Sequence, residues 1–246
     1  MYAFNRAFRP AASGALFLCI VLSSCSARID ATLRADGSAE ARVSASIEAR
    51  TAALIRNLSG LSGVQADRPV LDAAALSASL RASPAVRSAA LRNIDDRRVS
   101  GILSIGDFRL LASDSAARGS GSRPFVLVEK VEKGGAVHVH LDRTSAGSVL
   151  TALSPEIGEY LEALMAPAAT GEELTKSEYL SLVSSVYGSS VSAEIASAEL
   201  ELALTLPLPA SSVTGGRISG GIAEFTIPLV DLLVLEKPID LSAVWK

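Results

Sequence analysis

The chain has 246 residues and a formal net charge of −3, and its composition is 49% hydrophobic but only 4% aromatic. This length is enough for one large domain or two small ones with a substantial core. The slightly acidic balance excludes the basic surface that nucleic-acid-binding proteins carry. The scarcity of aromatic side chains argues against stacking platforms for bases or sugars and predicts a core of Ala, Leu, Val and Ile.

The N-terminal segment predicts a bacterial lipoprotein signal peptide. Arg6 and Arg9 precede an apolar stretch, which ends in the run Leu22-Ser23-Ser24-Cys25. A basic start, an apolar segment and small residues before a cleavage site are typical of a secretory signal, and the cysteine makes this run resemble a lipobox. The apolar stretch of about 12 residues is too short for a transmembrane helix, which needs about 20. We therefore expect cleavage between Ser24 and Cys25 and an acyl anchor, such as palmitate, on Cys25.

Cleavage would remove residues 1–24 as the signal peptide and leave residues 25–246 as a single domain. Cys19 would leave with the signal, so the acylated Cys25 would be the only cysteine of the mature chain. Disulfides, thiol catalysis and thiolate zinc sites are then excluded. The expected location is the cell envelope, where the domain is anchored to a bacterial membrane and faces the periplasm or the cell surface.

Residues 28–35 and 39–47 alternate strictly between apolar and polar types. A period of two is typical of a strand with one buried face, and Asp36-Gly37 between the two runs predicts a hairpin with a tight primed turn. Only Ser26 and Ala27 separate Cys25 from this hairpin, and two residues span at most about 7 Å. The folded domain should therefore lie close to the membrane.

Helical and extended segments follow in runs. The first half predicts helices at about 54–61 and from Asp72 to Ser83-Pro84, and strands at 86–94 and 98–105. The Gly/Ser-rich segment 113–123 is the best candidate for a sub-domain boundary. The second half predicts a hairpin of residues 125–131 and 136–141 around Gly134-Gly135. Two helices follow, one from Ser154-Pro155 and one that starts with a Thr175–Glu178 capping box and ends at Gly188. Strands are expected at about 200–206, 223–229 and 239–245, with a hairpin or loop at the glycine pairs 215–216 and 220–221. This grouping predicts an α+β fold with mostly antiparallel sheet.

The pattern resembles the LppM-type lipoproteins of cell envelopes. The lipobox cysteine is followed at once by an alternating strand, the turn Asp36-Gly37-Ser38, a second strand, a helical segment and the strand pair that contains Val99-Ser100-Gly101-Ile102-Leu103. The resemblance covers residues 25–110 and, more loosely, the last strands up to Trp245. It implies an α+β envelope domain that binds lipids. The chain departs from the family pattern by ending at Lys246, where these proteins commonly continue into a membrane helix, and by the block 163–188, which looks like an insertion.

Motifs for catalysis are absent from the sequence. The chain contains no Gly-x-Ser-x-Gly, His-Glu-x-x-His, P-loop or Gly-x-Gly-x-x-Gly motif, so we expect no enzyme activity and no cofactor. His138, His140 and Asp142 form a row on one strand face that could in principle ligate a metal. Because the alternate residues 137, 139 and 141 are apolar, we interpret this row as solvent-facing and expect no metal. The carboxylate pairs Asp95-Asp96 and Glu172-Glu173 are expected in loops or turns.

An apolar run lies near the C-terminus, between Pro228 and Pro238. One interpretation is a buried strand or short helix. The other is an apolar ligand or membrane contact, in which the leucines of the run would take part: Leu229, Leu232, Leu233 and Leu235. The run is too short to span a bilayer.

Two functions follow as expectations. The first is a membrane-anchored, non-catalytic lipoprotein that binds a lipid or another apolar ligand. The alternative is a structural or assembly lipoprotein that docks on a partner protein of the envelope. Both have the membrane as a partner through the N-terminal anchor, and neither involves nucleic acid.

We predict that Cys25→Ala moves the protein from the detergent phase to the aqueous phase and leaves the precursor unprocessed, because acylation and cleavage both need the thiol. Phase partitioning and intact-mass measurement check this. A variant that stays with the membrane and is still shortened by about 24 residues would contradict the signal assignment.

Overall fold

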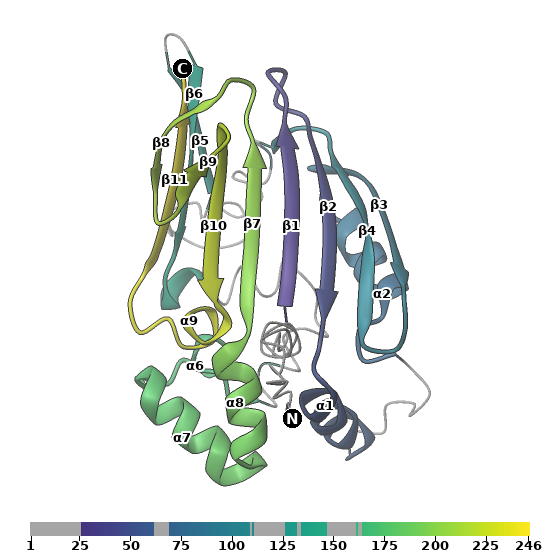
Figure 1. The fold of residues 1–246 in the computed structure, drawn as a ribbon. Helices are drawn as coiled ribbons and strands as arrows, with labels where there is room; N and C mark the ends of the chain where they lie inside the picture. The colour runs from purple at the N-terminus through teal and green to yellow at the C-terminus, as the bar shows by residue number, and fades with distance from the viewer. Residues whose placement is uncertain are drawn as a thin grey trace, which may run out of the picture.

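The computed structural model describes residues 26–61, 69–108, 110, 126–131, 134–146, 161 and 164–246. These residues form two sheets (Figure 1). The larger sheet has seven strands in the order β3 (Val86–Asn93), β4 (Arg98–Ile105), β2 (Ala39–Ser46), β1 (Ser26–Leu33), β7 (Glu199–Thr205), β10 (Ile222–Pro228) and β9 (Arg217–Ser219). The smaller has four, in the order β5 (Val126–Val131), β6 (Gly134–Leu141), β11 (Ile239–Trp245) and β8 (Ala210–Thr214).

Neighbouring strands are antiparallel in both sheets, except that β1 and β7 run parallel. The structure therefore confirms the α+β class with mostly antiparallel sheet. The parallel pair requires a long connection, and here the chain between β1 and β7 includes most of the other elements.

The helices lie mainly at one end of the large sheet (Figure 1). They are α1 (Ala49–Leu61), α2 (Ala73–Arg81), α6 (Pro167–Thr170), α7 (Lys176–Tyr187), α8 (Ser189–Ser197) and α9 (Leu229–Val234). α1, α7 and α8 extend beyond the end at which β1 begins, whereas α2 packs against β3. Ser77 of α2 accepts a hydrogen bond from the backbone amide of Leu91 in β3, so the helix covers part of this sheet edge.

The expected hairpin of β1 and β2 is present, and it pairs the apolar positions of the two runs, with Ile29 opposite Val43 and Ala31 opposite Ala41. The turn differs from the expectation. The Gly37 amide donates to the Arg34 carbonyl at 3.0 Å, and Gly37 has a φ of 89° whereas Asp36 has none in the positive range. A type I′ turn needs positive φ at both central residues, so this is a longer loop with a single left-handed glycine. The Asp36 carboxylate instead accepts hydrogen bonds from the Ser38 hydroxyl and amide, which lower its pKa.

The main core lies between the two sheets. Its buried side chains come from both of them and include Leu33, Ile105, Val137, Phe225, Leu241 and Trp245. The Trp245 ring lies over Gly135 of β6, where an added Cβ would approach the ring to 2.2 Å. The glycine therefore serves close packing and is part of a strand, although the sequence suggested a turn.

A second core holds the helices together at the end of the large sheet. It contains Tyr179, Val183, Val191, Ile195, Val230, Leu233 and Val234, from α7, α8 and α9. The expected capping box starts α7: the Glu178 amide donates to the Thr175 hydroxyl, and the Thr175 amide donates to the Glu178 carboxylate at 2.8 Å. Burial raises the pKa of Tyr179, whose hydroxyl donates to the Leu164 carbonyl.

Most expected elements are confirmed, including the helices α1, α2 and α7 and the strands β1–β7, β10 and β11. α6, α8 and β8 were not predicted, and the two glycine pairs were compatible with either a loop or a hairpin. They are the turns that bound β9, with positive φ at Gly215, Gly220 and Gly221. The segment 113–123 and the helix start at Ser154-Pro155 lie outside the described residues.

We predict that Gly37→Val destabilises the domain by about 1–3 kcal/mol, because a β-branched residue tolerates this left-handed conformation poorly. Gly37→Asn should cost less, since Asn visits this region more readily. Arg34→Ser should cost less than about 0.5 kcal/mol, because the Arg34 side chain is exposed. Urea unfolding checks the series, and equal effects of Gly37→Val and Arg34→Ser would contradict the hairpin geometry.

Candidate functional site

The residue expected to carry the lipid precedes the central strand of the large sheet. Ser26, the first described residue, pairs with Ser46 of β2 on one side and with Glu199 of β7 on the other. Ser24 and Cys25 lie outside the described residues. Because Ser26 already belongs to β1, Cys25 would be joined to the sheet without an intervening linker. A lipid on Cys25 would thus hold this end of the sheet, here called the anchor end, directly at the membrane.

Helices α1 and α8 are joined at the anchor end. The Glu194 carboxylate of α8 accepts hydrogen bonds from the backbone amide and the hydroxyl of Thr51 in α1, at 2.9 and 2.7 Å. Amides in the first turn of a helix have no partner within it, and a carboxylate there is favourable. This contact fixes the two helices beside the start of β1.

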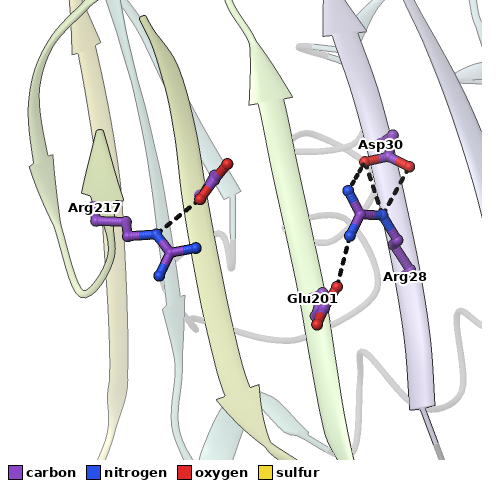
Figure 2. Close-up of polar contacts among 5 residues, drawn as sticks. Arg28, Asp30, Glu201 and Arg217 are labelled. Carbon is purple, nitrogen blue, oxygen red and sulfur yellow. Dashed lines mark hydrogen bonds and ion pairs between the residues drawn. The ribbon is translucent and has the colours of Figure 1, made fainter. Parts of the chain in front are cut away.

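The two faces of the large sheet differ in polarity. On the outer face, the Arg28 guanidinium lies between two carboxylates and donates to Asp30 at 2.9 Å and to Glu201 at 2.8 Å (Figure 2). Arg217 donates to Glu224 at 2.8 Å. The hydrogen bond with Asp30 is the main reason why the pKa of Arg28 is raised. Four of the five side chains are well exposed and Glu224 is partly exposed, so these pairs contribute little to stability and mark a water-facing surface.

A shallow hollow of about 320 Å³ lies on this outer face. It spans β2, β1, β7 and β10, and its charged lining consists of Arg28, Asp30, Glu40, Arg42 and Glu224. The two arginines and three carboxylates nearly balance, so the hollow has no strong excess of positive or negative charge. Nothing in its chemistry singles out a polyanion or a reactive substrate.

The inner face of the same strands is aliphatic, and its burial changes along the strands. Far from the anchor end, Leu33 and Ala39 are 9% and 3% exposed. On β1 and β2 the apolar side chains closer to Ser26 are only partly buried, whereas Ile227 of β10 at the same end is 7% exposed. We call this region the inner strip; it consists of Ala27, Ile29, Ala31, Val43 and Ala45. The alternating pattern predicts that these side chains lie on a core face, and their small size at successive inward positions is the signal that could have identified the strip.

Leu202 of β7 continues the inner strip on the other side of β1. The parallel register places it beside Ile29, and it packs against the main core. On the β7 side the strip therefore borders the main core through Leu202, which is itself partly buried. An extended apolar chain could lie along it without meeting a charged side chain of β1 or β2, because their charges alternate to the outer face.

Most of the apolar run 229–235 forms the short helix α9 (Leu229–Val234), and Leu235 caps its C-terminus with a φ of 48°. Leu233 is 4% exposed within the helical core, and Leu235 is 3% exposed in a small cluster with Ala146 and Ala168. Leu229 and Leu232 keep partial exposure. The contact of this run with a ligand or membrane stays a prediction, with only these two leucines accessible. No helix in the described part of the chain is long and apolar enough to cross a membrane.

His138 and His140 lie on β6, two residues apart. His140 is held between two carboxylates: its Nδ1 is 2.6 Å from Asp240 Oδ1 and its Nε2 is 3.3 Å from Asp142 Oδ2. The hydrogen bond with Asp240 is the main cause that raises the pKa of His140. The pKa of Asp142 is lowered, chiefly by the hydrogen bond from the Thr144 hydroxyl. Over the described ranges, no group of side chains is arranged to hold a metal ion, and this cluster links β6 to β11.

The paired carboxylates have structural surroundings. Asp95 accepts hydrogen bonds from the Arg97 amide at 3.0 Å and from the Arg98 guanidinium at 2.7 Å, and the first of these is the main cause of its lowered pKa. Asp96 forms an ion pair with Arg56 of α1. Glu172 and Glu173 are exposed in the loop before α7.

We predict that the link between β6 and β11 stabilises the domain in acid more than in base. A raised folded-state pKa means that His140 contributes stability below its unfolded pKa of about 6.5 and that this contribution is lost as pH rises through the folded pKa. His140→Asn should therefore cost stability at about pH 5, by less than about 1 kcal/mol because the ring is partly exposed, and less at about pH 9, where the neutral ring has only one N–H donor. Urea unfolding at both pH values checks this, and a cost that is the same at both would contradict it.

No protein-family model matches this chain, and no curated protein matches it. Among solved structures, the chain is similar to the folded domain of LppM from Mycobacterium tuberculosis, determined by NMR, with a TM-score of 0.40 and 14% sequence identity over 91% of this chain and 90% of that one. LppM gives its name to the family that the sequence pattern resembles. A TM-score of this size carries no inference about the ligand, the anchor or the function of the present chain.

Proposed function

We propose that this protein is a lipid-anchored lipoprotein of the bacterial envelope that holds an acyl chain or a similar apolar molecule against the inner strip. The observation that carries the proposal is that β1 begins directly after Cys25 and that its aliphatic face is incompletely buried at this same end. The ligand site and the membrane would then be adjacent.

The chemistry of the strip favours an aliphatic ligand. Ala, Ile and Val side chains offer dispersion contacts and release water without directional hydrogen bonds, at roughly 25 cal/mol per Å² of buried apolar surface. They present no aromatic surface on which a ring would stack. The ion-paired outer face of the same strands stays in water, so a single sheet separates the apolar side from the aqueous side.

Docking on an envelope protein is the second candidate function. Its supporting observation is that large apolar side chains are exposed in several places, for example Ile94 and Ile102, which are 54% and 46% exposed. In the described part of the chain the exposed large apolar side chains belong to separate elements, for example β4 for Ile102 and α7 for Val186, which makes docking the weaker candidate. Neither proposal includes catalysis, a cofactor or a metal.

We predict that acyl lipids co-purify with the soluble domain of residues 26–246 and are lost in Ile29→Asp. A carboxylate in an apolar site must be desolvated or protonated, and both are unfavourable. Val43→Trp tests the same site without adding charge, because the larger ring fills the strip. Native mass spectrometry and lipid extraction measure the bound lipid, and circular dichroism verifies the fold of each variant.

The matched control is Ile102→Asp, which places the same charge on the outer face of the sheet, opposite Arg42 of β2. This variant should keep its lipid. Equal retention by the inner and outer variants would contradict the proposed site. Absence of lipid from the unmutated domain, together with one specific protein recovered by cross-linking, would favour docking.

A further inference from the structure

The helical hairpin of α7 and α8 contains a long stretch without charge. The chain is 20% charged overall, yet residues 179–193 include no Asp, Glu, Lys or Arg. Glu178 precedes the stretch and Glu194 follows it. Glu194 is engaged with Thr51 and Glu178 with Thr175, so the flanking charges serve the helix ends.

The uncharged stretch includes the tip of the hairpin. α7 ends at Tyr187, and Gly188, with a φ of 93°, connects it to α8. Val186 is 53% exposed at this tip, and Tyr187 is partly exposed. The opposite sides of both helices are fixed, since Val183, Val191 and Ile195 are each at most 6% exposed in the helical core. The tip is therefore presented on a firmly packed base.

The hairpin extends beyond the anchor end of the large sheet (Figure 1). α8 leads directly into β7, whose first residue, Glu199, pairs beside Ser26. A lipid on Cys25 would enter the bilayer at the end of the molecule to which this hairpin belongs. One attachment point alone leaves a domain free to tilt, whereas a second contact beside it restricts the tilt.

We infer that the tip of the α7–α8 hairpin, residues 182–189, rests on the membrane surface beside the lipid anchor. The inference rests on the proposed function for the anchor and names a second membrane contact. An uncharged tip can enter the headgroup region without the cost of dehydrating an ion. Val186 adds apolar surface there, and the tyrosine ring suits an interface that is apolar on one side and wet on the other.

The test uses the full acylated protein in vesicles of phosphatidylethanolamine and phosphatidylglycerol. Val186→Cys introduces a unique free thiol for an environment-sensitive fluorophore, because Cys25 is acylated and Cys19 leaves with the signal. The matched control is Leu208→Cys, a side chain that is also apolar and 45% exposed. It follows β7 at its other end, about 20 Å or more from the anchor end. Lipids with spin labels near the headgroup quench fluorophores that reach the bilayer.

The expected result is a blue shift and strong quenching at position 186, with neither at position 208. Val186→Asp in otherwise native protein should lower the protection of the hairpin amides from hydrogen exchange on vesicles, while the protein still floats with them. Flotation without quenching at position 186 would overturn the membrane contact and leave the anchor intact. Failure of the protein to float would overturn the anchor and, with it, this inference.

Discussion

The position of β1 between β2 and β7 is the constraint on which the rest of the structure depends. Its alternating sequence assigns one face to ion pairs with neighbouring strands and the other to an aliphatic surface. Hydrogen bonding on both edges keeps the strand from slipping, because a shift by one residue would exchange the two faces. Since β1 starts at Ser26, this central strand also connects the predicted lipid directly to the sheet.

The two faces have different energetic roles. The ion pairs of Arg28 and Arg217 are exposed, and they give the outer face hydration and a preferred register more than stability. Stability comes from the core between the sheets, in which Phe225 and Trp245 are the largest buried side chains. The inner strip has properties of both: it is apolar like the core, yet its side chains are less buried than Leu33 at the other end of the same strand.

Local features of the fold could be predicted from the sequence. The hairpin, the capping box of α7 and the strand pair of β3 and β4 each depend on residues close in the chain, and all three are confirmed. The turn at Gly37 was placed correctly but given the wrong type, since Asp-Gly is compatible with more than one loop. α8 was missed because Gly188 indicated a helix end, and in the following run of Ser and Ala only Val191 and Ile195, one turn apart, indicate a second helix.

Features that depend on distant residues could not be predicted. Arg28 and Glu201 are 173 positions apart, and their ion pair exists only because β7 returns beside β1. The burial of Leu233 depends likewise on α7 and α8. The incomplete burial of Ile29 is a property of what packs over it, whereas alternation alone specifies only which way its side chain points.

The most direct test of the account is photo-cross-linking of the acylated protein in vesicles that contain a phospholipid with a diazirine at the end of one acyl chain. Mass spectrometry then identifies the modified peptides. If an acyl chain lies along the inner strip, the cross-links fall on β1 and β2, within residues 26–46, on the inward-facing positions. Cross-links that are absent from these strands, in protein that remains bound to the vesicles, would contradict it.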